Sequence, residues 1–535
     1  MKRGLLILTV TLLMGSMLAL GSPQPAEPTP GGTLTFVAAS SPDNLSPQAT
    51  VMAISFWVFS LLVDTLVAYD QNLEIVPHLA ESWEMSEDGL TWTFHLRRGV
   101  RFHDGTPFNA EAAAFSFNRF VAEAPVGILA QLKETVAVAE YTIEMRLTEP
   151  APMFLNDLTS ACAGIISPAA VAKYGEDFGI VNMVGTGPFK FHEFIPGERV
   201  VVVRNDEYTW GPAFVANPGP AHLERIELLV VPEPMTRVME FEDRVRRGDA
   251  VTAAIPPGDI LRLRADPAIQ TLERLAPGAS VLWINTTLWP FDDLRLREAL
   301  NHAINARDIV EFVLEGMAEP AYTFISSAQI GYEWAVGPIP PIRREFDPER
   351  ARELFAEAGW LPGPDGILAH QETGRRAEFK LLGNTGHIGE PEAIQAQLRE
   401  MGLNIRVSIL EPAASVARAR EGVYELYLIG YSWPDITLGF DLFHTRQIGG
   451  LNFSFFSDPQ VDELIDIGLT SLDPAERATA WNKAHVRILE QAPFVPMWHS
   501  KLFDMASMAV GGWVESLGAH PLRSRSIFAL DLYVR

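Results

Sequence analysis

The sequence predicts an α/β protein made of two lobes, and three observations lead to that prediction. Strand and helix patterns alternate in the second half of the chain, where the predicted elements are Glu378–Leu382, Ile388–Met401, Ile405–Ile409, Ala413–Glu421 and Leu426–Gly430. This order is typical of βαβ units and predicts a mostly parallel sheet. The first half is richer in strand patterns, and a mature chain of about 500 residues is too long for a single core. We therefore expect two lobes that meet at a cleft, and such clefts are preferred ligand sites.

The N-terminal segment predicts export from the cytoplasm. Lys2 and Arg3 precede an apolar run, Leu5–Leu20, and this pattern is typical of a signal peptide spanning residues 1–21. The run is short for a membrane span and no stop-transfer pattern follows it, although an uncleaved anchor is the alternative. Because no cysteine lies near the cleavage site, we expect no lipid anchor. Residues 22–30 are rich in proline and predict a mobile leader, so the mature protein is expected to be free in the periplasm of a two-membrane bacterium.

Charge and cysteine content exclude several function classes. The chain carries 67 acidic and 42 basic residues, for a formal net charge of −25. This balance argues against binding nucleic acid or anionic membrane surfaces, and favours neutral or cationic ligands only weakly. The single cysteine, Cys162, cannot form an internal disulfide, and its small apolar neighbours predict a buried thiol.

Local patterns define the elements of the first half. Gly32–Ala38 alternates as a strand, and Ile54–Tyr69 has the apolar spacing of a helix. A turn-prone SEDG leads into an alternating strand, Leu90–Leu96, and Phe108–Ala122 opens with the capping signal Asn109 and predicts a helix. Further strands are predicted at Val136–Leu147, Arg199–Asn205, Leu223–Val231 and Val281–Asn285, with a helix at Met235–Arg247.

The second half adds helices with clear ends. Asp293–Asn305 and Asp347–Gly359 are predicted helices, and the second stops at a glycine. Beyond the alternating segment, two late helices and two late strands are predicted at Asp458–Leu469, Pro474–Gln491, Phe494–His499 and Phe528–Val534.

A set of ordered motifs resembles one known family. The stretch LAESWEMSEDGLTWTFHLRRGVRFHDGTPF, Leu79–Phe108, is similar to the signature of the family-5 extracellular solute-binding proteins, the peptide/nickel-type receptors of ABC importers. GTLTF, VGTGPFKF, VRNDEYTWGP, LREALNHAINARDIV, FDPERARELFAEAGW, IGYSWPD and FSDPQVDELI match further family features in family order. Each motif is weak by itself, and most are structural, but together they span nearly the whole mature chain.

The resemblance implies a bilobed periplasmic-binding-protein fold of the large, three-subdomain type. Lobe I is expected at residues 31–275 plus 502–535, with an inserted subdomain at about residues 50–180, and lobe II at residues 277–501. The crossings near residues 277–281 and 495–501 are expected to form a hinge on which the lobes close. The implied partners are a small solute, most simply a peptide, and an ABC permease with its ATPase. The family further implies a monomer that is not an enzyme and has no cofactor.

The first candidate binding residues follow the apolar strand Leu426–Gly430. Tyr431, Ser432, Trp433 and Asp435 form a polar and aromatic loop at the end of a predicted parallel strand, where α/β sheets bind ligands. In peptide-binding relatives an aspartate of this loop pairs with the amino terminus of the ligand, and that position is Ser432 here. Trp433 is expected to line the site and Asp435 to make a polar contact. Alternatively, Trp433 packs within the lobe and Asp435 caps a turn.

A second departure concerns the ligand carboxylate. Dipeptide-type relatives place an arginine soon after the strand that is Glu378–Leu382 here, but this chain continues with Gly383–His387, which includes Asn384 and Thr385. Neither side chain can replace the charge of an arginine. With both chain-end clamps altered, the sequence argues against dipeptides and leaves longer peptides, oligosaccharides or another uncharged solute. A nickel chelate is a further alternative, and His444 is its candidate ligand, although nickel-type relatives place their histidine nearer residues 447–451.

Lobe I and the crossings supply the remaining candidates. The loop Ser41–Met52 resembles the family loop that faces the cleft, so Thr50, Met52 and Trp57 are predicted lining residues, with Trp57 alternatively in the core. Trp498 lies beside the second crossing and is expected either to line the cleft or to lock the hinge.

Motifs of other function classes are missing from the sequence. There is no HExxH, GxSxG, P-loop or CxxC pattern, which weakens a secreted hydrolase as the competing class. A sensory receptor or chaperone that shares the fold without delivering cargo is a third class. The sequence therefore predicts a solute receptor with no catalytic residues and no resident metal.

Overall fold

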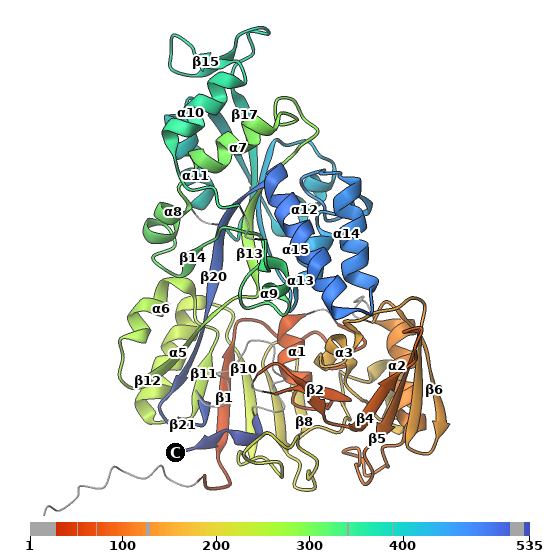
Figure 1. Cartoon of the computed structure of the whole chain (residues 1–535). Helices are drawn as coiled ribbons and strands as arrows, with labels where there is room; N and C mark the ends of the chain where they lie inside the picture. The colour runs from red at the N-terminus through yellow and green to blue at the C-terminus, as the bar shows by residue number, and fades with distance from the viewer. Residues whose placement is uncertain are drawn as a thin grey trace, which may run out of the picture.

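The computed structural model describes residues 28–50, 52–70, 72–124, 129–339, 342–387, 389–513 and 529–535, and it has two lobes, one above the other in Figure 1. The predicted signal peptide and most of the predicted leader lie outside these residues. Lobe I is the part built on β1, β8–β12 and the second half of β20. Lobe II is the part built on β13, β14, β17–β19 and the first half of β20.

One sheet runs through both lobes. Among the described residues it has twelve strands in the order β18-β17-β19-β13-β20-β11-β1-β10-β9-β8, with β12 and β14 also paired to β20. The strands of lobe I are β1 (Thr33–Ala38), β8 (Phe189–Ile195), β9 (Arg199–Arg204), β10 (Arg225–Val230), β11 (Val251–Ala253) and β12 (Ile269–Leu275). Those of lobe II are β13 (Gly278–Ile284), β14 (Ala318–Pro320), β17 (Glu378–Asn384), β18 (Asn404–Leu410) and β19 (Leu426–Ser432), and β20 (Phe494–Ser507) is shared.

Strand β20 joins the two lobes. Its first residues pair with β13, its middle with β14, and its last seven residues, Lys501–Ser507, pair with β12. The second connection is residues 276–277, between β12 and β13. The prediction of a strand at Phe494–His499 therefore found only its beginning, because the strand continues across the lobe boundary into lobe I.

Lobe I buries both faces of its sheet. Helices α5 (Pro234–Arg247) and α6 (Pro257–Arg264) cover one face around Phe241 and Leu263. The other face joins a larger core that includes the inserted elements. These are α1 (Ala53–Phe59), α2 (Ala110–Glu123), α3 (Phe154–Asp157), α4 (Pro168–Tyr174), β2 (Val67–Tyr69), β3 (Ile75–Pro77), β4 (Ala80–Met85), β5 (Thr91–Leu96), β6 (Leu132–Ala139) and β7 (Thr142–Leu147).

The inserted sheet has the order β4-β5-β7-β6 and packs on α2. The predicted strand Leu90–Leu96 is confirmed as β5, and Phe94 of β5 is fully buried in this core. Asn109 caps α2 as predicted, because its side chain accepts a hydrogen bond from the Ala112 amide at 3.0 Å.

One helix prediction in lobe I is wrong. The pattern Ile54–Tyr69 predicted a single helix, but α1 stops at Phe59 and β2 begins at Val67. The intervening backbone is packed against glycines: a Cβ on Gly185 would lie 2.2 Å from the Leu62 carbonyl oxygen. Residues 60–66 are buried because other backbone segments approach them closely. Their apolar side chains therefore reflect burial and do not indicate a helix.

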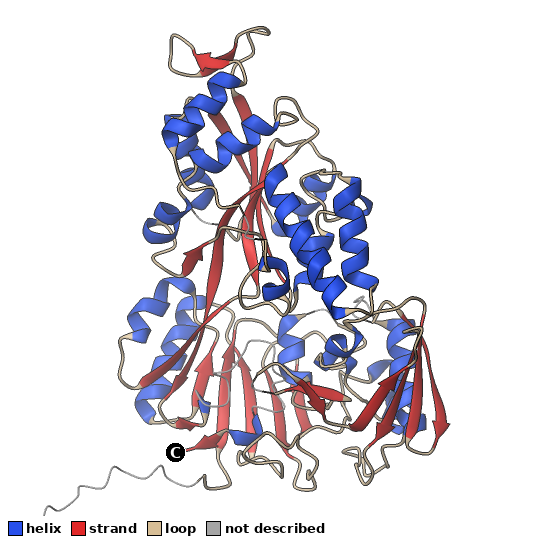
Figure 2. Ribbon diagram, viewed as in Figure 1, coloured by secondary structure: helices blue, strands red, loops and turns tan. Residues whose placement is uncertain are grey.

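Lobe II has helices on both faces of its sheet, as the blue ribbons on each side of the red strands in Figure 2 show. One face carries α7 (Leu294–Ala303), α8 (Ala306–Phe312), α10 (Pro348–Glu357) and α11 (Glu390–Glu400). The other carries α9 (Tyr332–Val336), α12 (Pro412–Arg420), α13 (Ile436–Asp441), α14 (Pro459–Thr470) and α15 (Pro474–Gln491). The small pairs β15 (Trp360–Pro362) with β16 (Leu368–His370), and β21 (Val510–Gly511) with β22 (Tyr533–Val534), complete the described strands.

The predicted mostly parallel sheet of lobe II is a mixed sheet. β17 pairs in parallel with β18 and β19, as the βαβ pattern predicted. β13 runs antiparallel to β19 and to β20. The reason is topological: β13 enters from lobe I and β20 returns to it, so neither strand belongs to a βαβ unit.

Candidate ligand-binding site between the lobes

The two parallel strands that carry predicted site residues end at the edge of lobe II that faces lobe I. The register pairs Ser432, the last residue of β19, with Gly278, the first residue of β13 after the crossing from lobe I. Leu382 of β17 lies level with Tyr427 of β19, so the residues that follow β17 reach the same edge. Loops at the carboxyl ends of parallel strands are where open α/β sheets bind ligands.

The loop after β19 is fixed at its backbone and partly open at its side chains. The Trp433 amide donates to the Pro277 carbonyl oxygen at 2.8 Å, which ties the loop to the crossing between the lobes. Ser432 is exposed and Trp433 is half-buried. Tyr431 packs into lobe II, where its hydroxyl donates to the Phe324 carbonyl oxygen at 2.7 Å.

Asp435 is the N-cap of α13 and is only 4% exposed. Its carboxylate accepts hydrogen bonds from the Thr437 amide at 2.8 Å and the Thr437 hydroxyl at 2.5 Å. Burial raises the pKa of this carboxyl, and the two Thr437 bonds offset only part of that rise. The sequence left open a polar contact or a capping role for Asp435; the structure shows the cap and places the same carboxyl at the lobe boundary.

The loop after β17 presents few polar groups. Asn384 is buried and its side-chain oxygen accepts from the Gly386 amide at 2.8 Å, so it shapes the turn. Thr385 is exposed. His387 meets Trp498 edge to face, with ring centroids 5.9 Å apart, and Trp498 is itself buried in lobe II where β20 approaches the crossing.

The predicted lobe I loop is organised by Asp43, a residue that the sequence analysis did not single out. Its Oδ1 accepts from the Thr50 hydroxyl at 2.6 Å and the Ser55 hydroxyl at 2.7 Å. Burial by itself raises the pKa of Asp43. The two hydroxyl bonds and the bond from the Asn44 amide lower it by more, so the pKa is below its usual value. Thr50 is therefore buried in a local network, whereas Met52 is exposed.

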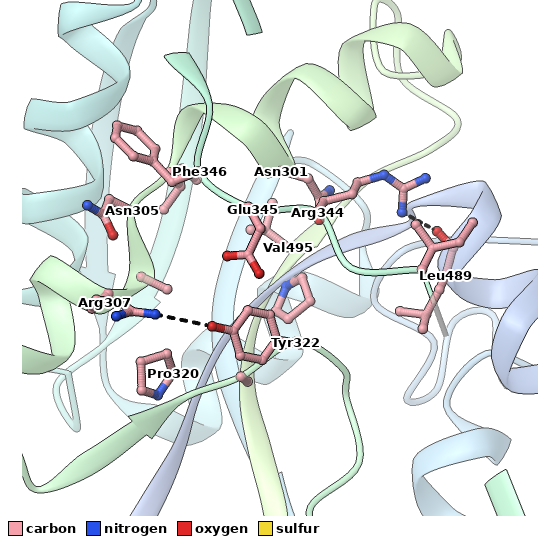
Figure 3. Close-up of a pocket in the computed structure, with 15 residues that line it drawn as sticks. Asn301, Asn305, Arg307, Pro320, Tyr322, Arg344, Glu345, Phe346, Leu489 and Val495 are labelled. Carbon is pink, nitrogen blue, oxygen red and sulfur yellow. Dashed lines mark hydrogen bonds between the residues drawn. The ribbon is translucent and has the colours of Figure 1, made fainter. Parts of the chain in front are cut away.

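Trp57 stacks on Phe36 of β1, with centroids 4.4 Å apart. Both rings line a cavity of about 460 Å³ in lobe I, together with Ile54, Phe503 and Trp513. The Trp513 indole nitrogen is buried and has no hydrogen-bond partner among the described residues. A second cavity, of about 260 Å³, lies in lobe II among Asn301, Arg307, Tyr322, Arg344 and Val495 (Figure 3). None of the sequence-predicted site residues lines this second cavity.

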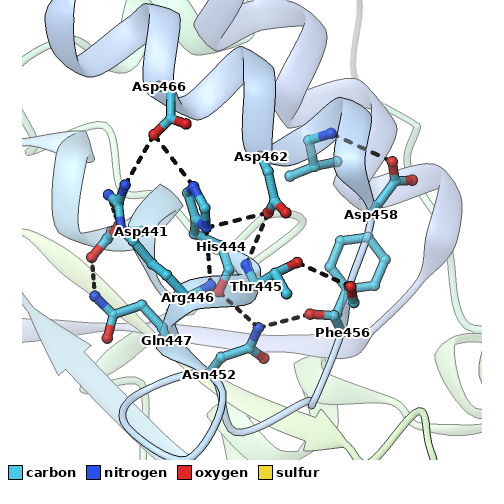
Figure 4. Close-up of polar contacts among 12 residues, drawn as sticks. Asp441, His444, Thr445, Arg446, Gln447, Asn452, Phe456, Asp458, Asp462 and Asp466 are labelled. Atoms are coloured by element: carbon cyan, nitrogen blue, oxygen red, sulfur yellow. Dashed lines mark hydrogen bonds and ion pairs between the residues drawn. The ribbon is translucent and has the colours of Figure 1, made fainter.

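His444 lies in a network that attaches α14 to the rest of lobe II (Figure 4). Its Nδ1 accepts from the Arg446 amide at 3.1 Å and lies 3.4 Å from Asp462, and its Nε2 lies 3.3 Å from Asp466. Arg446 pairs with Asp466 at 2.9 Å, so this carboxylate already has a cationic partner, while Asp462 accepts from the Thr445 amide at 2.8 Å. Among the described residues there is no group of three or more His, Cys, Asp or Glu side chains arranged to hold a metal ion.

The lobes touch at residues that sequence reasoning missed. A Cβ on Gly89, in the turn before β5, would lie 2.9 Å from the Leu472 methyl carbons, so lobe II packs directly on lobe I here. Burial raises the pKa of Asp157, at the end of α3, and the charge of Asp435 raises it further. No periodicity or motif predicts these contacts, because each joins residues that are far apart in the sequence and meet only when the chain has folded.

Comparison with known proteins identifies the family. The model of the bacterial extracellular solute-binding proteins, family 5 (middle region), matches residues 74–444. The chain belongs to this family. Its members are periplasmic binding proteins, and the resemblance seen in the sequence and the predicted bilobed fold are both confirmed. Among the described residues, no helix is long and apolar enough to cross a membrane.

Similar proteins cover almost the whole chain. Heme-binding protein A of Haemophilus influenzae is 29% identical over 525 residues, covering 92% of this chain and 91% of its own. The dipeptide-binding protein of Escherichia coli is 27% identical over 531 residues, covering 92% and 94%. A solved structure, the periplasmic binding protein DppA from Helicobacter pylori in complex with the peptide STSA, is 25% identical with a TM-score of 0.71, covering 95% and 98%.

Proposed function

We propose that this family-5 protein captures a peptide between its lobes and delivers it to an ABC permease, whose ATPase drives uptake. The observation that carries the proposal is the family match over residues 74–444, which takes in parts of both lobes and the lobe II loops after β17 and β19. A peptide is favoured over other solutes because a dipeptide-binding protein and a peptide complex are among its similar proteins.

The lobe boundaries that we propose are residues 31–275 plus 502–535 for lobe I, with an inserted subdomain at about residues 50–180, and residues 277–501 for lobe II. Support comes from the buried cores: one pair of cores uses residues up to Ile269 and again from Met505, and the other pair uses residues from Ala279 to Trp498. Residues 277–281 and 495–501 are the proposed hinge, since both chain crossings fall there.

The proposed site lies where the loops after β17 and β19 face lobe I. Trp433 is its main lining residue, because its backbone is tied to the crossing while its side chain is half-buried. Exposed Ser432 and Thr385 supply hydrogen-bonding groups. The ligand stabilises the closed form by binding it better than the open form, and the closed form docks on the permease.

We further propose that residues 1–21 are removed as a signal peptide and that the mature monomer is free in the periplasm. The motif pattern and the lack of a cysteine near the cleavage site support this. The binding role requires no catalytic group and no resident metal.

The first test is mass spectrometry of the natively expressed protein before and after denaturation. Release of peptides on denaturation supports the proposal and gives their length range. Release of a sugar or a metal complex overturns the peptide assignment and leaves the receptor role. If no mass is released, a thermal-shift screen of peptides, oligosaccharides and nickel–histidine decides, since a ligand that binds only the folded state raises the melting temperature.

A further inference from the structure

The cavity of about 460 Å³ in lobe I reaches the carboxyl ends of parallel strands. β1 pairs in parallel with both β10 and β11, so the carboxyl ends of three adjacent strands share one edge of the sheet. The cavity wall includes Ala39 and Ser40, which follow β1, and Ala254 and Ile255, which follow β11. Figure 1 shows β1 rising toward lobe II, with α1 beside its upper end. The cavity thus reaches the edge of lobe I that faces lobe II, and open α/β sheets bind ligands at such edges.

The lining residues become more exposed from the inner end of the cavity to its mouth. The inner wall is apolar and buried, since Leu34, Ile226 and Leu532 are each 5% exposed or less. Phe36 and Trp57, whose rings are stacked, are half-buried, and the two residues that follow β1 are exposed. The volume lies within the range of about 300–1,000 Å³ that is usual for ligand pockets. A large apolar or aromatic group fits such a wall and gains free energy by leaving water.

An ion pair in the cavity wall has one free donor and one free acceptor. Arg274 of β12 and Asp504 of β20 both line the cavity. The Arg274 Nε donates to Asp504 Oδ2 at 2.9 Å, and Arg274 Nη2 donates to the same oxygen. Among the described residues, Arg274 Nη1 and Asp504 Oδ1 have no hydrogen-bond partner. A donor beside an acceptor matches the C=O and N–H of one extended residue, as in an antiparallel strand pair.

The ion pair lies close to the proposed site in lobe II. Arg274 precedes Pro277 by three residues, so their Cα atoms are at most about 11 Å apart. The Pro277 carbonyl oxygen accepts from the Trp433 amide at 2.8 Å. An extended peptide of about four residues spans such a distance, so one peptide can contact Trp433 and the cavity together.

We propose that this cavity is a side-chain subsite, which takes one large apolar or aromatic side chain of the bound peptide. Arg274 Nη1 donates to the main-chain carbonyl oxygen of that residue, and its N–H donates to Asp504 Oδ1. Main-chain groups of this kind occur along the whole peptide, so the contact requires neither end of the ligand. The proposal rests on the proposed function in requiring a peptide ligand, and it adds which kind of residue the receptor selects.

The test is isothermal titration of the full mature protein, freed of cargo by denaturation and refolding. The probes are pentapeptides with phenylalanine or alanine at the centre of four alanines, each made with free ends and with acetylated and amidated ends. Ala53→Trp adds an indole to the cavity wall at the exposed start of α1. The matched control is Ala356→Trp, at an exposed alanine of α10 that does not line the cavity.

We expect wild type and Ala356→Trp to bind the phenylalanine peptide about tenfold or more tightly than the alanine peptide, with free or blocked ends. Ala53→Trp should bind the two peptides alike. Equal affinity of wild type for both peptides overturns the subsite and leaves the peptide role, as does a preference that persists in Ala53→Trp. Binding of the free-ended peptides alone shows that the chain ends are recognised, which also overturns the subsite. If no peptide binds, the proposed function fails and the subsite fails with it.

The ion pair is tested by methylating the central nitrogen of the blocked phenylalanine peptide, which removes the N–H that donates to Asp504. Methylation should weaken binding about tenfold in wild type, because a hydrogen bond to a charged group is lost. The same loss is expected in the control Asp259→Ala, which removes an aspartate of α6 that pairs with Arg262. In Asp504→Ala the methylated and unmethylated peptides should bind alike, since the acceptor is already absent. An undiminished loss in Asp504→Ala would overturn the role of the ion pair.

Discussion

At the scale of single residues, Asp64 shows most clearly how burial and hydrogen bonds set the protonation state of a carboxyl. It is buried in lobe I, where its carboxylate accepts from the Trp210 indole at 2.9 Å and the Tyr208 hydroxyl at 3.2 Å. Burial raises the pKa of Asp64 to about 7, and burial lowers that of the adjacent His78 to about 3. The pair is thus neutral at mildly acidic pH, so the network is held by hydrogen bonds.

We expect Asp64→Ala to lower the free energy of unfolding by about 1–3 kcal/mol, because the Trp210 indole and the Tyr208 hydroxyl each lose a hydrogen bond and keep only their longer contacts, to the Thr186 carbonyl oxygen at 3.2 Å and His78 Nε2 at 3.4 Å. Asp64→Asn should cost less. The pKa of Asp64 is higher in the folded than in the unfolded protein, so its contribution to stability falls as the pH rises from about 4 to about 7. Urea unfolding across this range checks both points. If the asparagine variant keeps the wild-type pH slope, another group is responsible.

Trp433 is the residue on which ligand binding should depend most. We expect Trp433→Ala to weaken binding about tenfold or more, because a large aromatic surface of the proposed site is lost. Isothermal titration with the cargo identified by mass spectrometry measures the change. Trp83→Ala, in the inserted sheet of lobe I, is the control and should leave affinity unchanged. Equal affinity of wild type and Trp433→Ala would remove this residue from the site.

Residue roles were predictable from sequence when they were local. Asn109, Asp347 and Asp458 cap their helices because a cap depends only on the next three residues. Asp157 and Leu472 were not predictable, since nothing in their own segments indicates the opposite lobe. The roles of the predicted site residues Trp433, Ser432 and Thr385 stay predictions.

At the scale of elements, two helical glycines give opposite expectations. Gly468 of α14 faces Trp481 of α15, and a Cβ added there would lie 2.5 Å from the indole ring. Gly258 of α6 has no heavy atom within 4 Å of an added Cβ. Gly468→Ala should therefore destabilise lobe II by about 1–3 kcal/mol through overpacking, despite the better helix propensity of alanine.

Gly258→Ala serves as the matched control and should stabilise by about 0.5–1 kcal/mol, since alanine loses less backbone entropy on folding. Urea midpoints of the two variants are the measurement. A Gly468→Ala protein as stable as wild type would mean that Trp481 can move aside.

Element predictions succeeded where periodicity was long and the ends were marked. Pro474–Gln491 was predicted with the bounds that α15 has, and in the structure Asp473 caps the start of this helix. The prediction of one helix at Ile54–Tyr69 was wrong because part of this segment is buried by glycine backbones from elsewhere in the chain. The mixed sheet of lobe II was missed for a related reason: strand direction at β13 and β20 is set by the return to lobe I.

At the scale of the whole molecule, the order of motifs was enough to predict the two lobes, while the identity of the ligand was beyond the sequence. A fold can be recognised from many weak motifs along the chain. Ligand specificity depends on a few side chains that come together from distant segments. Ser432 and Asn384, where the resemblance predicts altered chain-end clamps, illustrate this limit. These positions predict which contacts of dipeptide-type relatives are lost, but they do not predict which side chains replace those contacts.

The contact of Leu472 with Gly89 offers a direct test of closure. Leu472→Ala removes apolar contact between the lobes and should cost about 1 kcal/mol of closed-state stability, which is about a fivefold loss of affinity. Leu361→Ala, an exposed leucine of β15 in lobe II, is the control. Because the contact forms after the ligand has entered, the loss should appear as faster dissociation with unchanged association in stopped-flow binding. An unchanged dissociation rate would mean that the lobes touch at Leu472 in the open state as well, and closure would then have to involve other residues.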